Sequence, residues 1–132
     1  MLIDQYNQVK ENVKQACKKA GRDPREVTII AVSKTKPLEM IEELRKEKVK
    51  DFGENKVQEL REKYEKISWP VRWHLIGHLQ TNKVKYIVDK VALIHSVDSV
   101  HLAKQINKEA AKHQMKEVPV LIQVNFARGD TK

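Results

Sequence analysis

The chain has 132 residues, of which 40% are hydrophobic and 33% charged, so its length suits one domain and its composition is that of a globular protein rather than a disordered tail. No apolar run approaches the roughly 20 residues that a membrane span needs, and the N-terminus lacks the basic and apolar regions of a secretory signal. The single cysteine, Cys17, excludes an internal disulfide framework, so we expect a cytoplasmic protein with no membrane partner.

The formal net charge of +8 raises the question of a nucleic-acid partner. A nucleic-acid site would gather its basic residues on one face, whereas the 26 Lys and Arg are spread along the chain and mixed with 18 Asp and Glu. Segments such as "EELRKEK" and "QELREKYEK" alternate in sign, which is typical of exposed helix faces. The pattern argues against nucleic acid and is compatible with a site for a small phosphorylated ligand.

The predicted elements begin with a helix over 2–20, where apolar residues recur at helical spacing before Gly21. Strands and helices then alternate. In chain order we expect strand 28–33, a helix opened by Pro37, strand 49–54, helix 55–67, strand 72–77, a short helix over 82–91, strand 92–97, a helix from Asp98 or Ser99 to about 115, and strand 118–125. Such alternation predicts a parallel sheet covered by helices, either an open doubly wound sheet or part of an eight-stranded barrel.

Polar or glycine residues close every predicted strand. They are Ser33 and Lys34, then Gly53, Glu54 and Asn55, then Gly77 and His78, then Ser96 and Asp98, and finally Asn125. Ligands of parallel α/β folds lie at these carboxyl ends. The pattern therefore favours a binding site at this edge of the sheet.

Lys34 is the strongest candidate, because it follows an apolar strand and its amine therefore lies at the carboxyl end of the predicted sheet. Loss of hydration there favours the neutral amine, which can attack an aldehyde. The alternative is a lysine whose ammonium extends from the loop into water.

The other polar residues are weaker candidates. Asn55 suits a helix N-cap, and Glu54 either orients a neighbour or faces solvent. His74 and His78 have no acidic or cysteine partner nearby in the sequence, so a metal site is not expected. Cys17 fits a small core residue on the apolar face of the first helix.

Five segments together, "AVSKTKP", "FGENKVQE", "WHLIGHLQTNK", "IHSVDS" and "VLIQVN", closely resemble the pyridoxal 5'-phosphate (PLP) homeostasis protein family, the YggS type of bacteria and the proline synthetase co-transcribed homologue of animals. The resemblance implies a (β/α)8 TIM-type barrel like the N-terminal barrel of alanine racemase, preceded by a helix. It also implies that Lys34 forms the internal aldimine with the cofactor and that Asn55 lines the cofactor pocket. Lys36 and Lys132 match lysines near that pocket.

The chain is shorter than the family's chains and offers five predicted strands where a barrel needs eight. The missing part supplies the phosphate-binding strand ends in the family, and no Gly-rich phosphate cradle occurs in this sequence. We therefore expect residues 1–132 to form a single domain that is the N-terminal portion of a PLP-binding barrel. Its two open sheet edges predict self-association.

The resemblance implies a cofactor carrier that buffers PLP and delivers it to PLP-dependent acceptor enzymes, without substrate turnover. Racemases of this fold need a second acid–base group, and Tyr6, Tyr64 and Tyr86 all fall on predicted helices. Two alternatives remain open: a PLP enzyme of the racemase or decarboxylase kind, and a non-catalytic basic interaction module.

Overall fold

A computed structural model describes residues 2–34 and 36–124 of the chain. The elements are α1 (Leu2–Ala20), the 3-10 helix η1 (Pro24–Glu26), β1 (Ala31–Val32), α2 (Leu38–Arg45), β2 (Asp51–Glu54), α3 (Val57–Lys66), β3 (Arg72–Leu75), the 3-10 helix η2 (Thr81–Tyr86), β4 (Val91–Val97), α4 (Val100–Lys112) and β5 (Val120–Ile122). No helix within these ranges is long and apolar enough to cross a membrane.

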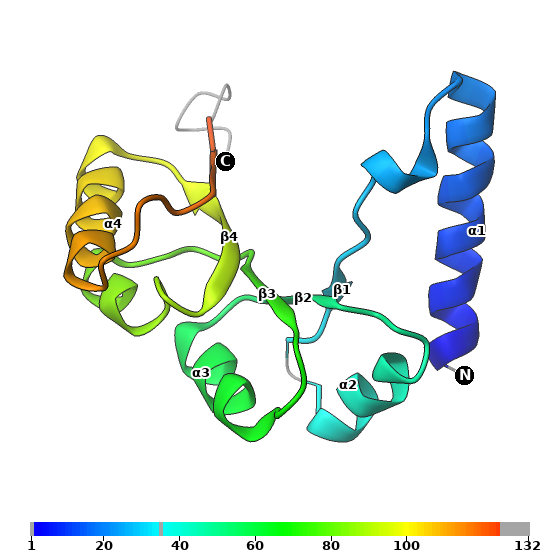
Figure 1. Cartoon of the computed structure of the whole chain (residues 1–132), viewed down its shortest axis with the longest axis horizontal. Coiled ribbons are helices and arrows are strands. Elements are labelled where there is room, and N and C mark those ends of the chain that lie inside the picture. The colour runs from blue at the N-terminus through cyan, green and yellow to red at the C-terminus, as the bar shows by residue number, and fades with distance from the viewer. Residues whose placement is uncertain (1, 35, 125–132) are drawn as a thin grey trace, which may run out of the picture.

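The five strands form one parallel sheet in the order β1-β2-β3-β4-β5. Figure 1 shows the sheet as an arc with α2, α3 and α4 along its outer side, and α1 stands at the β1 end of the arc, where it contacts α2 and η1. A doubly wound sheet would reverse its strand order and carry helices on both faces. Sequential order with helices on one side is the arrangement of a (β/α)8 barrel, which confirms the predicted partial barrel.

The first and last elements differ most from expectation. The predicted strand 28–33 shrinks to β1, because pairing with β2 begins only at Ala31, opposite Phe52. The expected helix over 82–91 is the short 3-10 helix η2. η1 was not predicted; Asp23 accepts a hydrogen bond from the Arg25 N–H and caps it.

Two helices begin or end at the residues that the sequence predicted. Gly21 ends α1 with a φ of +69°, a left-handed conformation that costs glycine little. Ser99 caps α4 by accepting a hydrogen bond from the Leu102 N–H. Cys17 is buried on α1, as predicted.

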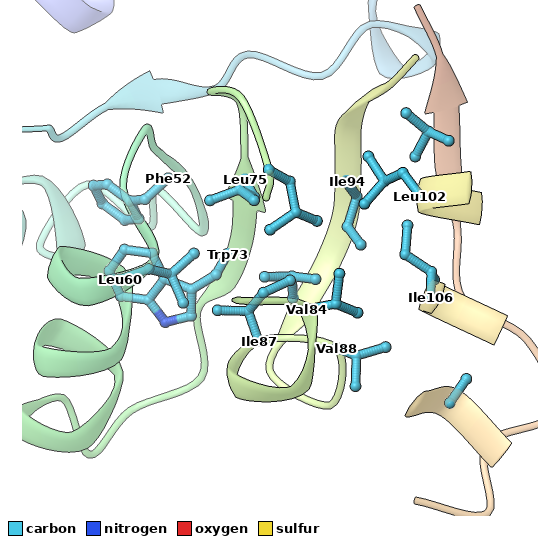
Figure 2. Close-up of a cluster of buried hydrophobic side chains, with 14 of the residues drawn as sticks. Phe52, Leu60, Trp73, Leu75, Val84, Ile87, Val88, Ile94, Leu102 and Ile106 are labelled. Atoms are coloured by element: carbon cyan, nitrogen blue, oxygen red, sulfur yellow. The ribbon is translucent and has the colours of Figure 1, made fainter. Parts of the chain in front are cut away.

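The core lies between the outer face of the sheet and the helices that cover it (Figure 2). Phe52 of β2 and Trp73 of β3 are paired in register, and their ring centroids lie 6.1 Å apart. Leu60 of α3 and Ile94 of β4 are fully buried in the same cluster. Each such side chain contributes roughly 1.5–3 kcal/mol through burial, so this layer holds α3, η2 and α4 against the strands.

Candidate functional site

Two predicted cofactor residues follow neighbouring strands at the carboxyl edge of the sheet. Lys34 comes after β1 and Asn55 comes directly after β2, and these strands are paired. Lys36 is exposed, and its backbone N–H donates to the Ser33 carbonyl at 3.1 Å. Lys132, like Asn125, lies outside the described residues. The fold thus brings Lys34 and Asn55 to one edge.

Lys34 itself is exposed, so the expectation that it lies dehydrated is wrong for the described part of the chain. The reason is its place in the sheet. β1 is an edge strand of two residues with β2 as its only neighbour among the described strands, so few groups flank the residues that follow it. Lys34 is consequently an exposed residue rather than a buried one.

The backbone beside Lys34 is held by a buried ionic cluster. Lys63 of α3 donates from Nζ to the Ser33 carbonyl at 2.6 Å, to Glu54 Oε2 at 2.9 Å and to Glu59 Oε2 at 2.7 Å. The Ser33 hydroxyl donates to the same Glu54 oxygen. Because the Lys63 side chain is 8% exposed and that of Glu54 0%, water competes little for these bonds.

Glu54 is the electrostatic centre of this cluster. Burial raises the pKa of Glu54, and the hydrogen bonds from Ser33 and Lys63 oppose that rise. Its second oxygen, Oε1, is buried without a hydrogen-bond partner among the described residues. Of the two sequence-based alternatives for Glu54, orientation of a neighbour is confirmed and exposure to solvent is wrong.

Asn55 is placed by a close approach of two backbone segments. A Cβ at Gly77 would lie 2.8 Å from the Asn55 Cα and 3.0 Å from its carbonyl carbon, so only glycine fits there. The Ser96 hydroxyl donates to the Gly77 carbonyl at 2.6 Å and ties the contact to β4. The predicted N-cap role of Asn55 is wrong: Lys56 is the N-cap of α3, and no side chain caps the helix.

A second polar cluster lies on the inner face of the sheet, opposite the core. Arg72 donates to the two Asp51 oxygens at 2.9 and 2.6 Å. The ring of His74 bridges Asp51, at 2.9 Å from Nε2, and His95, at 2.9 Å from Nδ1. Burial alone would raise the pKa of Asp51, but hydrogen bonds and charge from Arg72 and His74 lower it. Burial, and then the charge of His74, lower the pKa of His95.

Sequence reasoning missed two of these residues. Asp51 is the acidic partner of His74 that the linear sequence did not reveal, since it comes from the neighbouring strand. No group of three or more His, Cys, Asp or Glu within 2–34 and 36–124 is arranged to hold a metal ion. Lys63 carried a detectable signal, because it lies three residues after the buried Leu60, on the face of α3 that meets the sheet.

The comparison with known proteins agrees with this geometry. Residues 5–129 match the family model described as alanine racemase, N-terminal domain. The chain belongs to this family. Within it, the chain is 43% identical over 130 residues to the pyridoxal phosphate homeostasis protein of Aquifex aeolicus, covering 98% of this chain and 57% of that protein. The resemblance stated from the sequence is thereby confirmed.

Two solved structures show the same architecture as this alanine racemase N-terminal domain. PipY of Synechococcus elongatus PCC7942, solved with PLP bound, matches with a TM-score of 0.74 and 32% identity over 87% of this chain and 55% of that one. A protein of Bifidobacterium adolescentis described as unknown matches with a TM-score of 0.84 and 28% identity, over 99% of this chain and 57% of that one. The chain therefore spans just over half the length of these relatives.

Proposed function

We propose that this chain binds PLP through Lys34 and takes part in PLP homeostasis, as a reversible carrier of the cofactor. The observation that carries the proposal is the position of Lys34 at the carboxyl end of β1, beside Asn55 at the end of β2. The names of the relatives support it, since a homologue is a pyridoxal phosphate homeostasis protein and PipY was solved with PLP.

The described residues fit the aldehyde end of the cofactor. The cofactor supplies an aldehyde that reacts reversibly with a primary amine. Lys34 is an exposed residue at the end of β1, and its primary amine would be the group that holds the aldehyde carbon. Lys63 anchors the preceding Ser33 carbonyl, so the Lys34 backbone keeps its place during exchange. Asn55 and Lys36 provide polar contacts at the same edge.

The described residues provide fewer groups to bind the phosphate of PLP than to bind its aldehyde. The described strand ends have no run of glycines that would cradle a phosphate with backbone N–H groups. Binding by these residues then depends on Lys34 and on polar side chains, which favours ready exchange. Exchange of this kind suits a protein that buffers PLP and passes it to PLP-dependent acceptor enzymes.

The same proposal includes the absence of substrate turnover. Tyr6 and Tyr64 lie on α1 and α3 and Tyr86 on η2, not at the strand ends beside Lys34. Proton abstraction from an amino-acid α-carbon requires an acid–base group at the reacting atom. Incubation with PLP and alanine in deuterated water checks this: we expect every α-proton to be retained, and Lys34-dependent loss would establish an enzyme instead.

The direct test is borohydride reduction after incubation with PLP, followed by peptide mapping. We expect label on Lys34 and its loss in Lys34→Ala. The matched control is Lys50→Ala, which removes an exposed lysine at the opposite, amino-terminal end of β2. Label that persists in Lys34→Ala, spread over many lysines, would refute the assignment.

Three further properties belong to the proposal. Residues 1–132 act as a single domain that forms the N-terminal portion of a PLP-binding barrel. The chain works in the cytoplasm, in keeping with its single cysteine. It self-associates through β5, whose Leu121 and Ile122 are 49% and 76% exposed, because such an apolar sheet edge can pair with a second copy.

A further inference from the structure

A cavity of about 540 Å³ lies between the start of α3 and η2, at some distance in the chain from Lys34. Its lining includes Lys56, Arg61, His78, Lys83 and Tyr86, together with Asn55, which also belongs to the proposed PLP site, and we call it the α3–η2 pocket. The volume lies in the range of roughly 300–1,000 Å³ that small-molecule sites occupy. The elements that form it follow β2 and β3 in the middle of the sheet, so the pocket does not involve the strands at the two sheet edges.

The charge of the α3–η2 pocket has one sign. Lys56, Arg61 and Lys83 line it, and no Asp or Glu is among the described residues that do so. None of these three cations forms an ion pair within residues 2–34 and 36–124. Lys63 on the same helix differs, because Glu54 and Glu59 neutralise it. The pocket therefore holds an uncompensated positive charge.

The Tyr86 ring lies close to two of these cations, Arg61 and Lys83, and to Lys85. The Arg61 guanidinium carbon lies 4.3 Å from the centroid of the Tyr86 ring, and the ammonium nitrogens of Lys85 and Lys83 lie at 5.2 and 6.0 Å. Tyr86 is half-buried and packs against the core, so its ring is a fixed platform. A guanidinium held over an aromatic ring still has N–H groups that can donate to a planar or tetrahedral anion.

The backbone adds to the same field. α3 has ten residues and begins at the pocket, since its N-cap Lys56 and its first residue Val57 both line the cavity. The N-cap Lys56 makes no side-chain capping hydrogen bond, and the positive end of the helix dipole faces the cavity that Lys56 and Val57 line.

We propose that the α3–η2 pocket binds a small phosphate-bearing anion at a site whose lining does not include Lys34. A concave site with Arg61 over the Tyr86 ring and flanking Lys56 and Lys83 matches a compact dianion, whereas an extended polyanion needs a stripe of cations along the surface. The proposal does not depend on capture of PLP by Lys34.

The test is titration of the full 132-residue chain with inorganic phosphate at low salt, followed by backbone amide shifts in NMR spectra. We expect saturable shifts at Lys56, Gln58 and Lys83. Arg61→Gln and Lys83→Gln should each raise the dissociation constant for phosphate about tenfold, as expected for the loss of one charge-assisted hydrogen bond. Lys83 is exposed, so Lys83→Gln keeps the test valid should Arg61→Gln unfold the chain.

Two matched variants decide between sites. Lys104→Gln removes one charge from an exposed position on α4 and should leave the dissociation constant within about twofold. Lys34→Ala should also leave it unchanged. Equal weakening in Lys104→Gln and Arg61→Gln would reduce the effect to non-specific screening and overturn the proposal. Loss of phosphate binding in Lys34→Ala, with retention in Arg61→Gln, would move the anion to the Lys34 edge and overturn it as well.

Discussion

Replacement of Lys63 with methionine removes the ammonium at the centre of the buried cluster while keeping a side chain of similar length. Three hydrogen bonds from Nζ are lost, and the carboxyl of Glu54 remains fully buried. Breaking a buried ion pair from one side costs about 3–5 kcal/mol, because the remaining charge has no partner. Glu54 can avoid that charge only by taking up a proton.

The magnitude follows from this protonation. Without Lys63, the pKa of Glu54 rises further above its ordinary 4.5, because nothing but Ser33 then opposes burial. pH 7 is about 2.5 units above the ordinary pKa of a glutamate carboxyl. Keeping the Glu54 carboxyl neutral at pH 7 therefore costs about 3.4 kcal/mol, at 1.36 kcal/mol per pH unit. At pH 4 that cost disappears, and the three lost hydrogen bonds remain, worth about 1 kcal/mol each.

The sign with pH is therefore defined. A carboxyl whose pKa is raised by folding stabilises the folded state most below its unfolded pKa, and this stability is lost as pH rises toward the folded pKa. The penalty of Lys63→Met should be larger at pH 7 than at pH 4 by about 3.4 kcal/mol. In urea unfolding followed by circular dichroism, with a slope of about 2 kcal/mol per molar, the fall in midpoint at pH 7 should exceed that at pH 4 by about 1.7 M.

Controls isolate the buried charge. Lys66→Met changes an exposed lysine in the last turn of the same helix and should shift stability by less than about 0.5 kcal/mol. The double change Lys63→Met with Glu54→Gln should recover part of the loss at pH 7, since no buried charge then remains. An equal penalty at pH 4 and pH 7, or one below about 1 kcal/mol at pH 7, would refute the reasoning.

Three further predictions concern other regions. Gly77→Ala should destabilise the chain by about 1–3 kcal/mol and reduce borohydride trapping of PLP, because the new Cβ displaces the Asn55 backbone. The control is Gly21→Ala, whose Cβ meets no atom within 4 Å. It should cost about 1 kcal/mol through the φ of +69° and leave trapping intact. Because folding lowers the pKa of His95 below 6.5, stability should fall as pH drops below 6.5, and His95→Gln should flatten that slope in urea midpoints; an unchanged slope would exclude His95 as its source. Ile122→Lys should lower the molecular mass of the assembly measured by sedimentation, because the 76% exposed Ile122 is proposed to lie between two copies of the chain. An unchanged mass would contradict self-association through β5.

Prediction from sequence worked best where one local pattern governs the outcome. Helical spacing over 2–20 matches α1, and the capping role of Ser99 depends on residues three positions apart. The predicted strands were too long, most clearly the one over 28–33, because the length of a strand depends on how far its neighbour pairs with it. The choice between a doubly wound sheet and a barrel arc also waited for the strand order.

The site divides in the same way. The position of Lys34 and Asn55 at strand ends could be read from the chain, because a parallel sheet brings all carboxyl ends to one edge. The exposure of Lys34 could not, since it depends on which strands flank β1.

By itself, the amino-acid sequence determined the alternation of strands and helices, the family motifs and the lysine offered at the end of the first strand, since these depend on residue types at short spacing. The tertiary structure alone decided which charges meet. Lys63 contacts Ser33 across 30 positions and His74 contacts Asp51 across 23, and both contacts exist only because parallel pairing and helix packing bring distant residues within hydrogen-bond distance. Burial then sets how strongly those charges interact, and burial is a property of the packed chain.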